Sequence, residues 1–339
     1  MAPAPPSRLD ALFADLALFQ QAGDEDSQAR CCHRIGRLLL ERGQARPALQ
    51  AVRLGLAAAG EAAWLRAPLQ ALVGELLLQR RHLGLARRFL SAATASYRDA
   101  GLPIASRATE LAEALLRGDD DPEAARSRAQ AELAAAQAAG DRLGFAAALV
   151  VLGEIDASEQ HFEGCRLCGQ AALDALELRA ERDRPLDATE RRLLADASSL
   201  LGRGRAAQGE LELAVAPLKR AVSLREAGRP ALLARDLEWL GYARARLGQL
   251  GEARAAYTQA LQLREQADLT DSAARVALGL AATCGQNPAE ATRFLITAVE
   301  LLARSRRAPP ELVERATEQL QALPKSHLVT QLLQRLAKL

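Results

Sequence analysis

The stretch at residues 240–260, LGYARARLGQLGEARAAYTQA, decides the fold. Most of it consists of strong helix formers such as alanine, leucine, arginine and glutamine, and Gly248 interrupts it near the middle. Small residues stand at Gly241, twelve positions later at Ala253, and seven positions after that at Ala260. The stretch therefore predicts two helices joined by a turn, in which Gly241 lets the second helix cross closely at Ala253.

The same spacing of small residues recurs in seven units along the chain. The triplets are Gly36, Ala48 and Gly55; Gly74, Ala86 and Ala93; Ala112, Ala124 and Ala131; Gly153, Cys165 and Ala172; Gly202, Ala214 and Ala221; Gly241, Ala253 and Ala260; and Gly279, Ala291 and Ala298. Their first members lie 38, 38, 41, 49, 39 and 38 residues apart. The third member, two helical turns beyond the second, is expected to receive the next unit. This repetition predicts an all-α array of stacked helical hairpins without strands.

These units resemble the tetratricopeptide repeat (TPR) family, whose signature is Leu-Gly on the first helix, helix A, and two alanines flanking a large residue on the second, helix B. The best match is Leu240, Gly241, Gly248, Ala253, Tyr257 and Ala260, and the resemblance covers about residues 29–308. It implies a right-handed α-α superhelix, the TPR solenoid, with a concave groove. The repeats look lengthened, as in kinesin light chains and in regulatory domains of bacterial transcription activators.

The two ends of the chain are expected to cap the array, because its end faces would otherwise be apolar and exposed. We expect residues 1–28 to form a Pro-rich tail and a capping helix at 9–21, and residues 29–308 to form the seven repeats. Residues 309–339 are expected to form C-terminal capping helices, the last of them at 327–339. The leucines expected on one stripe of that last helix are Leu328, Leu332, Leu333 and Leu336.

The composition excludes several classes of partner. Forty-four basic and 42 acidic residues leave a net charge of +2, and only 3% of residues are aromatic, so no general nucleic-acid-binding surface is expected. No segment reaches the ~20 apolar residues of a membrane span. Asp10 and Asp15 interrupt the apolar N-terminal stretch, unlike a secretory signal, and five cysteines do not form a disulfide framework. We therefore expect a cytoplasmic protein without nucleic-acid binding or membrane insertion.

The sequence offers no catalytic motif. The four histidines are dispersed, and a nucleophile elbow, a Walker loop and a His-Glu-x-x-His motif are absent. The run Asp119, Asp120 and Asp121 lacks the spacing of a calcium loop, whereas Asp121 before Pro122 is typical of a helix N-cap. We expect neither enzymatic activity nor a bound cofactor.

One cluster leaves a metal or redox role open. His161, Cys165 and Cys168 are spaced four and three residues apart, so one helical face carries all three, and with a water they would make an open zinc site. Cys165 also occupies the small-residue position of its unit, where a buried cysteine packs as a small apolar residue. Core packing is the favoured interpretation, and we expect no bound metal.

The resemblance also implies which residues of helix A face the groove: the residue after the small residue, the fourth beyond that, and the third before the small residue. From these positions and their neighbours, the candidate partner-binding residues are Arg37, Leu40, Glu75, Leu78, Glu110, Glu113, Leu116, Glu154, Arg203, Trp239 and Tyr242. The carboxylate clamp of some TPR proteins needs two asparagines, and this chain has only Asn287.

The first repeats pair a row of leucines with a row of glutamates. On their own helices, Gln79 and Ser158 leave Glu75 and Glu154 uncompensated. A groove of this kind suits an amphipathic segment that carries arginine or lysine. Two alternatives stay open: the glutamates belong to solvated helix faces, or the C-terminal helix of the chain fills the groove.

Charges stand on helix A where the family usually keeps an aromatic residue, at Asp156, Arg205 and Arg244. Either the register of repeats four to six differs from the other repeats, or these charges form a ladder of ion pairs between neighbouring repeats.

Together these features predict a non-enzymatic scaffold or adaptor that binds a peptide or protein partner in the groove. One alternative is a regulatory protein in which ligand or peptide binding changes the pitch of the superhelix. A second is a metal- or redox-responsive protein that uses His161, Cys165 and Cys168.

Overall fold

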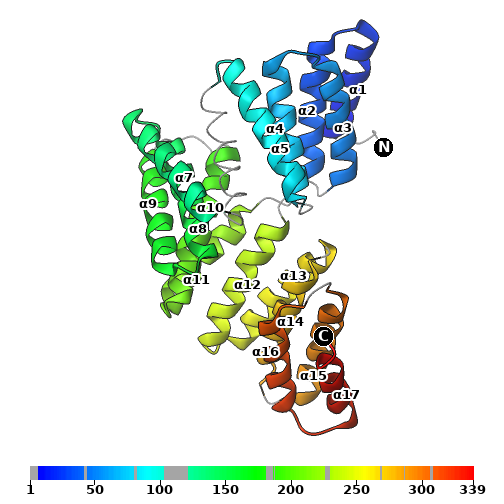
Figure 1. Cartoon of the computed structure of the whole chain (residues 1–339), viewed down its shortest axis with the longest axis vertical. Coiled ribbons are helices and arrows are strands. Elements are labelled where there is room, and N and C mark those ends of the chain that lie inside the picture. The colour runs from blue at the N-terminus through cyan, green and yellow to red at the C-terminus, as the bar shows by residue number, and fades with distance from the viewer. Residues whose placement is uncertain are drawn as a thin grey trace, which may run out of the picture. The chain divides into compact units, whose positions relative to one another are not determined.

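The chain is helical throughout the part that the computed structural model describes, which is residues 7–41, 44–79, 82–102, 121–180, 186, 188–225, 230–267, 269–285, 287–305 and 308–339. These residues form sixteen α-helices and no strand (Figure 1). The first eight are α1 (Arg8–Ala22), α2 (Glu25–Glu41), α3 (Ala45–Ala58), α4 (Ala63–Gln79), α5 (Leu83–Asp99), α7 (Pro122–Ala138), α8 (Arg142–Ser158) and α9 (Phe162–Ala180). The others are α10 (Ala188–Ala207), α11 (Leu211–Leu224), α12 (Pro230–Arg246), α13 (Leu250–Gln266), α14 (Thr270–Ala282), α15 (Pro288–Arg304), α16 (Pro310–Gln321) and α17 (His327–Leu336). The predicted all-α repeat architecture is confirmed.

The chain divides into two compact units. Unit 1 contains Met1–Gln160, Ala171–Leu193 and Glu226–Arg229, and unit 2 contains His161–Gln170, Leu194–Arg225 and Pro230–Leu339. The sequence did not predict this division, because the spacing of small residues reports only on contacts between neighbouring helices.

Unit 1 is built from pairs of helices that are consecutive in the chain. α2 packs on α3, α4 on α5 and α7 on α8, while α2 also contacts α4. Ile35, Val52, Leu69 and Leu72 are at most 2% exposed and form the centre of the hydrophobic core around α2, α3 and α4. Removing these side chains from water is the main force that holds the pairs together.

Unit 2 repeats this arrangement. α12 packs on α13 and α14 on α15, and the alternate helices α12, α14 and α16 contact one another in that order. We call these three helices the α12–α14–α16 layer. Leu278, Leu295, Leu302 and Leu320 are at most 1% exposed in the core at the C-terminal end of the unit.

The first small residue of a unit makes room for a large side chain of helix B. A Cβ atom added to Gly36, Gly74, Gly202 or Gly241 would lie between 2.5 and 2.9 Å from a side-chain carbon of the residue sixteen positions later, namely Val52, Leu90, Leu218 or Tyr257. The predicted second members Ala48, Ala86, Ala214 and Ala253 are fully buried one turn before these large residues. The close crossing is therefore confirmed, but the tightest contact is with the large residue.

In the first unit, the third small residue receives the next unit, as expected. A Cβ atom on Gly55 would lie 2.9 Å from the Cδ2 atom of Leu69, which belongs to α4. Ala93, Ala172, Ala221, Ala260 and Ala298 are fully buried.

The register predicted for the third unit is wrong. Ala124 and Ala131 are exposed, and the buried stripe of α7 is Ala125, Ala129 and Ala136. Alanines stand on several faces of this helix, so the spacing of small residues does not identify the buried face. The first predicted member of this triplet, Ala112, and the acidic residues Asp119 and Asp120 lie outside the described residues.

Turns and caps follow the local sequence. Gly248 has φ +74° and Gly209 has φ +84°, values that residues with a Cβ atom rarely adopt, and each ends a helix A. The Asp121 side chain accepts a hydrogen bond of 3.0 Å from the amide of Ala124 and caps α7, as predicted.

The charged row on helix A does not form the continuous ladder that was one of the two predictions. Arg244 pairs with Glu252 at 2.8 Å, and Arg205 donates to the carbonyl oxygen of Leu213 at 3.1 Å, so both contacts stay within one hairpin. Only Asp156 is bound from an earlier hairpin, by Arg126 at 2.7 Å. A long arginine at the end of helix A reaches the start of helix B more easily than the next repeat.

The last helix buries Val329, Leu332 and Leu336, whereas Leu328 is 42% exposed, so the predicted leucine stripe is wrong at its first residue. None of the described helices combines the length and the apolar character that crossing a membrane requires.

Candidate functional site

The predicted groove residues fall into three groups. Glu110, Glu113, Leu116 and the side chain of Leu78 lie outside the described residues. Arg37, Leu40, Glu75 and Glu154 belong to unit 1, whereas Arg203, Trp239 and Tyr242 belong to unit 2. The predicted acidic row is thus described only at Glu75 and Glu154.

Two of the predicted residues are buried and present no surface to a partner. Leu40 is 4% exposed because it belongs to the hydrophobic core of unit 1. Arg203 is 6% exposed on α10, where every residue from 193 to 204 is buried. A helix that is buried all round has no groove face, so the positional rule fails there.

Glu75 has a charged neighbour that the sequence analysis did not foresee. The Nη1 atom of Arg37, on α2, lies 3.9 Å from Oε2 of Glu75, on α4. The prediction that Glu75 is uncompensated is wrong, because Arg37 approaches it from a different helix. Burial, together with the charges of Arg37 and Arg34, lowers the pKa of the nearby His33 to about 4.

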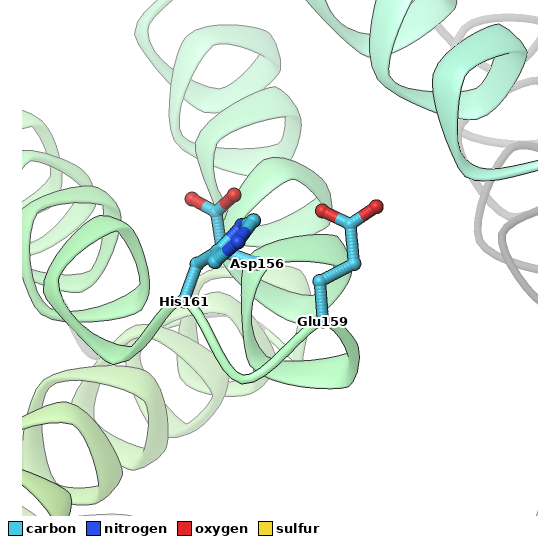
Figure 2. Close-up of side chains that lie close together, drawn as sticks. All are labelled: Asp156, Glu159 and His161. Atoms are coloured by element: carbon cyan, nitrogen blue, oxygen red, sulfur yellow. The ribbon is translucent and has the colours of Figure 1, made fainter.

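Three potential metal ligands lie at the turn after α8 (Figure 2). Asp156, Glu159 and His161 each offer one ligand atom, and these atoms lie within 4.8 Å of one another. Arg126 of α7 already binds both carboxylates, with Nη1 2.7 Å from Asp156 Oδ1 and Nη2 2.5 Å from Glu159 Oε2. Its guanidinium supplies the positive charge that a metal would supply, and the hydrogen bond to Asp156 raises the pKa of Arg126.

The predicted metal alternative used His161, Cys165 and Cys168, and these three do not form such a group among the described residues. In the described part of the chain, the three-ligand grouping contains neither Cys165 nor Cys168. Cys165 is fully buried and its thiol donates to the carbonyl oxygen of Leu200 at 3.4 Å, which supports the packing interpretation.

Trp239 and Tyr242 do lie together, on α12. Their ring centroids are 5.7 Å apart in an edge-to-face arrangement, and Phe162 adds a third ring 6.1 Å from Trp239. Nη1 of Arg246 donates to the Tyr242 hydroxyl at 3.1 Å. All three rings are half-buried. Three of the eleven aromatic residues of the chain (two Trp, three Tyr and six Phe) therefore form one partly accessible cluster, which we call the α12 aromatic cluster.

Glu238 lies one turn before Tyr242 on α12 and is bound by arginines from two other helices. Arg275 of α14 places Nε 2.5 Å from Oε1 and Nη2 3.4 Å from Oε2 of Glu238. Arg264 of α13 places Nη2 3.5 Å from Oε2. Neither arginine was among the predicted site residues, although Arg275 follows Glu238 by 37 residues, close to one repeat period.

A buried ion network lies close to this site. Arg225, which follows α11, donates from Nε to Asp236 Oδ2 at 2.7 Å and from Nη1 to Asp196 of α10. The Ser199 hydroxyl donates to Asp236 Oδ1 at 2.5 Å. Although burial alone lowers the pKa of Arg225, the two carboxylates outweigh it and raise that pKa.

Two solved structures resemble the chain over almost its whole length. The apo form of the quorum sensor NprR from B. thuringiensis is 12% identical, with 97% of each chain covered and a TM-score of 0.53. A Rap protein complexed with competence and sporulation factor is 13% identical, with 97% of this chain and 96% of that chain covered and a TM-score of 0.55. No family model and no curated protein matches the chain. At these identities the likeness shows the fold alone: a TPR-like helical repeat.

Proposed function

We propose that the chain is a non-enzymatic binding protein whose α12–α14–α16 layer takes up a peptide or a segment of a partner protein. The observation that carries the proposal is the α12 aromatic cluster, whose three rings are each only partly buried. Aromatic side chains with an apolar body and a polar edge are the residues that most often dominate the binding energy of interfaces. Glu238 and Arg275 supply charge beside them.

The fold comparison adds support of a weaker kind. One similar protein is a quorum sensor, and the other was solved with a bound factor. A scaffold or adaptor role needs only partner binding. A sensing role also needs a change of shape, and these two proteins make it the second candidate. Small-angle scattering with and without a selected peptide separates the two, because only a sensor changes its scattering curve beyond the mass of the peptide.

The experiment is a selection of nonapeptides from a displayed random library against the full chain, followed by calorimetry on the best binders. Trp239→Ala should weaken binding at least about 30-fold, the effect of a hot-spot residue of ~2 kcal/mol. Trp64→Ala is the matched control, because Trp64 is also an accessible tryptophan, 42% exposed, but lies in unit 1. Equal effects of both substitutions, or a failure to select any binder, would sink the proposal.

A basic amphipathic partner at the acidic row of unit 1 receives less support than this site. Arg37 already lies beside Glu75, and part of the row lies outside the described residues. If such a partner binds there, charge reversal at Glu75 and Glu154 should slow its association, and added salt should weaken it.

A further inference from the structure

We propose that the arginines around Glu238 form a site for the carboxylate of an acidic side chain in the bound segment. This inference rests on the proposed function and assigns the chemistry of the partner: an aspartate or glutamate next to an apolar residue. The partner proposed here is acidic and binds unit 2, whereas the sequence predicted a basic partner at the acidic row of unit 1.

Around Glu238, guanidinium groups outnumber carboxylates. Arg264 and Arg275 share the single carboxylate of Glu238. These three described side chains thus supply two guanidinium groups and one carboxylate, which leaves one positive charge in excess.

Arg264 is buried, and its hydrogen bonding is incomplete. Its side chain is 8% exposed, and its buried Nε atom has no hydrogen-bond partner in the described part of the chain. Burial, with the charges of Arg275 and Arg235, outweighs the attraction of Glu238 and lowers the pKa of Arg264. A buried donor without an acceptor and a buried charge that is only partly compensated are both costly, so an added carboxylate nearby stabilises the site.

Arg275 is accessible to an incoming ligand. Its side chain is 48% exposed while it binds Glu238. Arg315, on α16, is also exposed, and its charge acts on the same Tyr257 hydroxyl that feels Glu238. Asp271, one turn before Arg275, forms no ion pair with it among the described residues. An incoming carboxylate therefore meets Arg275 at the surface of α14.

The residues of α12 that lie near Glu238 determine which side chains surround the bound acidic residue. Trp239 directly follows Glu238, and Tyr242 stands one turn further along α12. Tyr242 is four residues from Glu238 and thus on the same face of α12, so a segment whose carboxylate binds Arg275 can present a neighbouring side chain to Tyr242. Guanidinium groups bind carboxylates through paired, charge-assisted hydrogen bonds, which favours this ligand over a neutral amide.

The test uses C-terminally amidated peptides from the selection described above, so that only side-chain carboxylates are present. Binders of the wild-type chain should be enriched in Asp and Glu, and replacing the acidic residue by Gln should weaken binding about tenfold or more. The Arg275→Gln variant should bind the acidic peptide and its Gln counterpart equally. Arg293→Gln is the matched control, because it removes an exposed arginine from α15 in the same unit.

The outcomes separate this inference from the proposed function. Peptides that depend on Trp239 but show neither acidic enrichment nor a Gln effect would overturn the carboxylate site and leave the proposed function standing. The same loss in Arg293→Gln as in Arg275→Gln would reduce the effect to net charge and also overturn it. Peptides whose affinity is unchanged by Trp239→Ala would overturn both the carboxylate site and the proposed function.

Discussion

The α2–α4 region of unit 1 and the α10–α12 region of unit 2 show the same spacing of small residues but are joined differently. Around Gly36, the neighbouring helices meet through the side chains of Val52 and Leu72. Between α10, α11 and α12, the joint contains Arg225 with Asp196 and Asp236. The small residues thus mark close crossings in both regions, but between α10 and α12 a buried ion network adds to the joint between hairpins.

This difference predicts that unit 2 depends more on single side chains. Asp236→Ala should lower the free energy of unfolding by about 3–5 kcal/mol, because it leaves the buried Arg225 with Asp196 alone. Denaturant unfolding followed by circular dichroism measures the loss. The triple variant Asp196→Leu/Arg225→Met/Asp236→Leu, which removes all three charges, should recover much of it. A loss under ~1 kcal/mol for the single variant would show that the network is not a structural joint.

In unit 1, the stability of the fold is expected to depend on the protonation of one side chain, His33. Its pKa is about 4 in the folded protein against 6.5 as its ordinary value, so the unfolded chain binds more protons between these two pH values. Stability is therefore fully present above pH 6.5 and falls as the pH drops to 4, by at most about 3.5 kcal/mol at ~1.4 kcal/mol per pKa unit.

The measurement is the unfolding free energy of wild type and His33→Gln at pH 7 and at pH 4.5. Carboxylate titration affects both proteins alike and cancels in the comparison. The wild type should lose more stability than the variant, and parallel losses would refute the assignment.

Overpacking the hairpin should have a smaller effect. Gly241→Leu should cost about 1–3 kcal/mol, because even a Cβ atom there lies 2.9 Å from the Tyr257 ring. Gly251→Leu is the matched control on α13, where a Cβ atom would meet nothing within 4 Å. Thermal unfolding that is unchanged in Gly241→Leu would show that the crossing is not tight.

The smallest effect is expected at the half-exposed pair of unit 1. Glu75→Gln should change stability by under about 1 kcal/mol, because Arg37 and Glu75 are 3.9 Å apart and partly in solvent. A larger loss in the same unfolding experiment would mean that this pair, like Arg225 and Asp236, joins two hairpins.

The sequence predicts the fold well because closely packed helices require small residues at regularly spaced positions. Gly36, Gly74, Gly202 and Gly241 lie where only a hydrogen fits, and their spacing in the sequence is visible without a structure. This spacing mispredicts Ala124 and Ala131, because alanines on several faces of α7 do not distinguish buried from exposed positions.

The site is less accessible to sequence reasoning. Trp239 and Tyr242 were found because they share a helix, whereas the arginines that bind Glu238 come from α13 and α14. Pairing across repeats depends on how long side chains extend between helices, and a chain rich in arginine offers many candidate partners. Leu40 and Arg203 were placed on a groove face because the positional rule carries no information on how deeply each helix is buried.

The most direct measurement is the fluorescence of Trp239 in a Trp64→Phe background, where it is the only tryptophan of the chain. Titration with the tightest selected peptide should change the emission of Trp239 saturably, with the same Kd as calorimetry, and the matching Gln peptide should need about tenfold or more higher concentration for the same change. Peptide binding that calorimetry detects while the emission of Trp239 stays constant would contradict binding at the α12–α14–α16 layer.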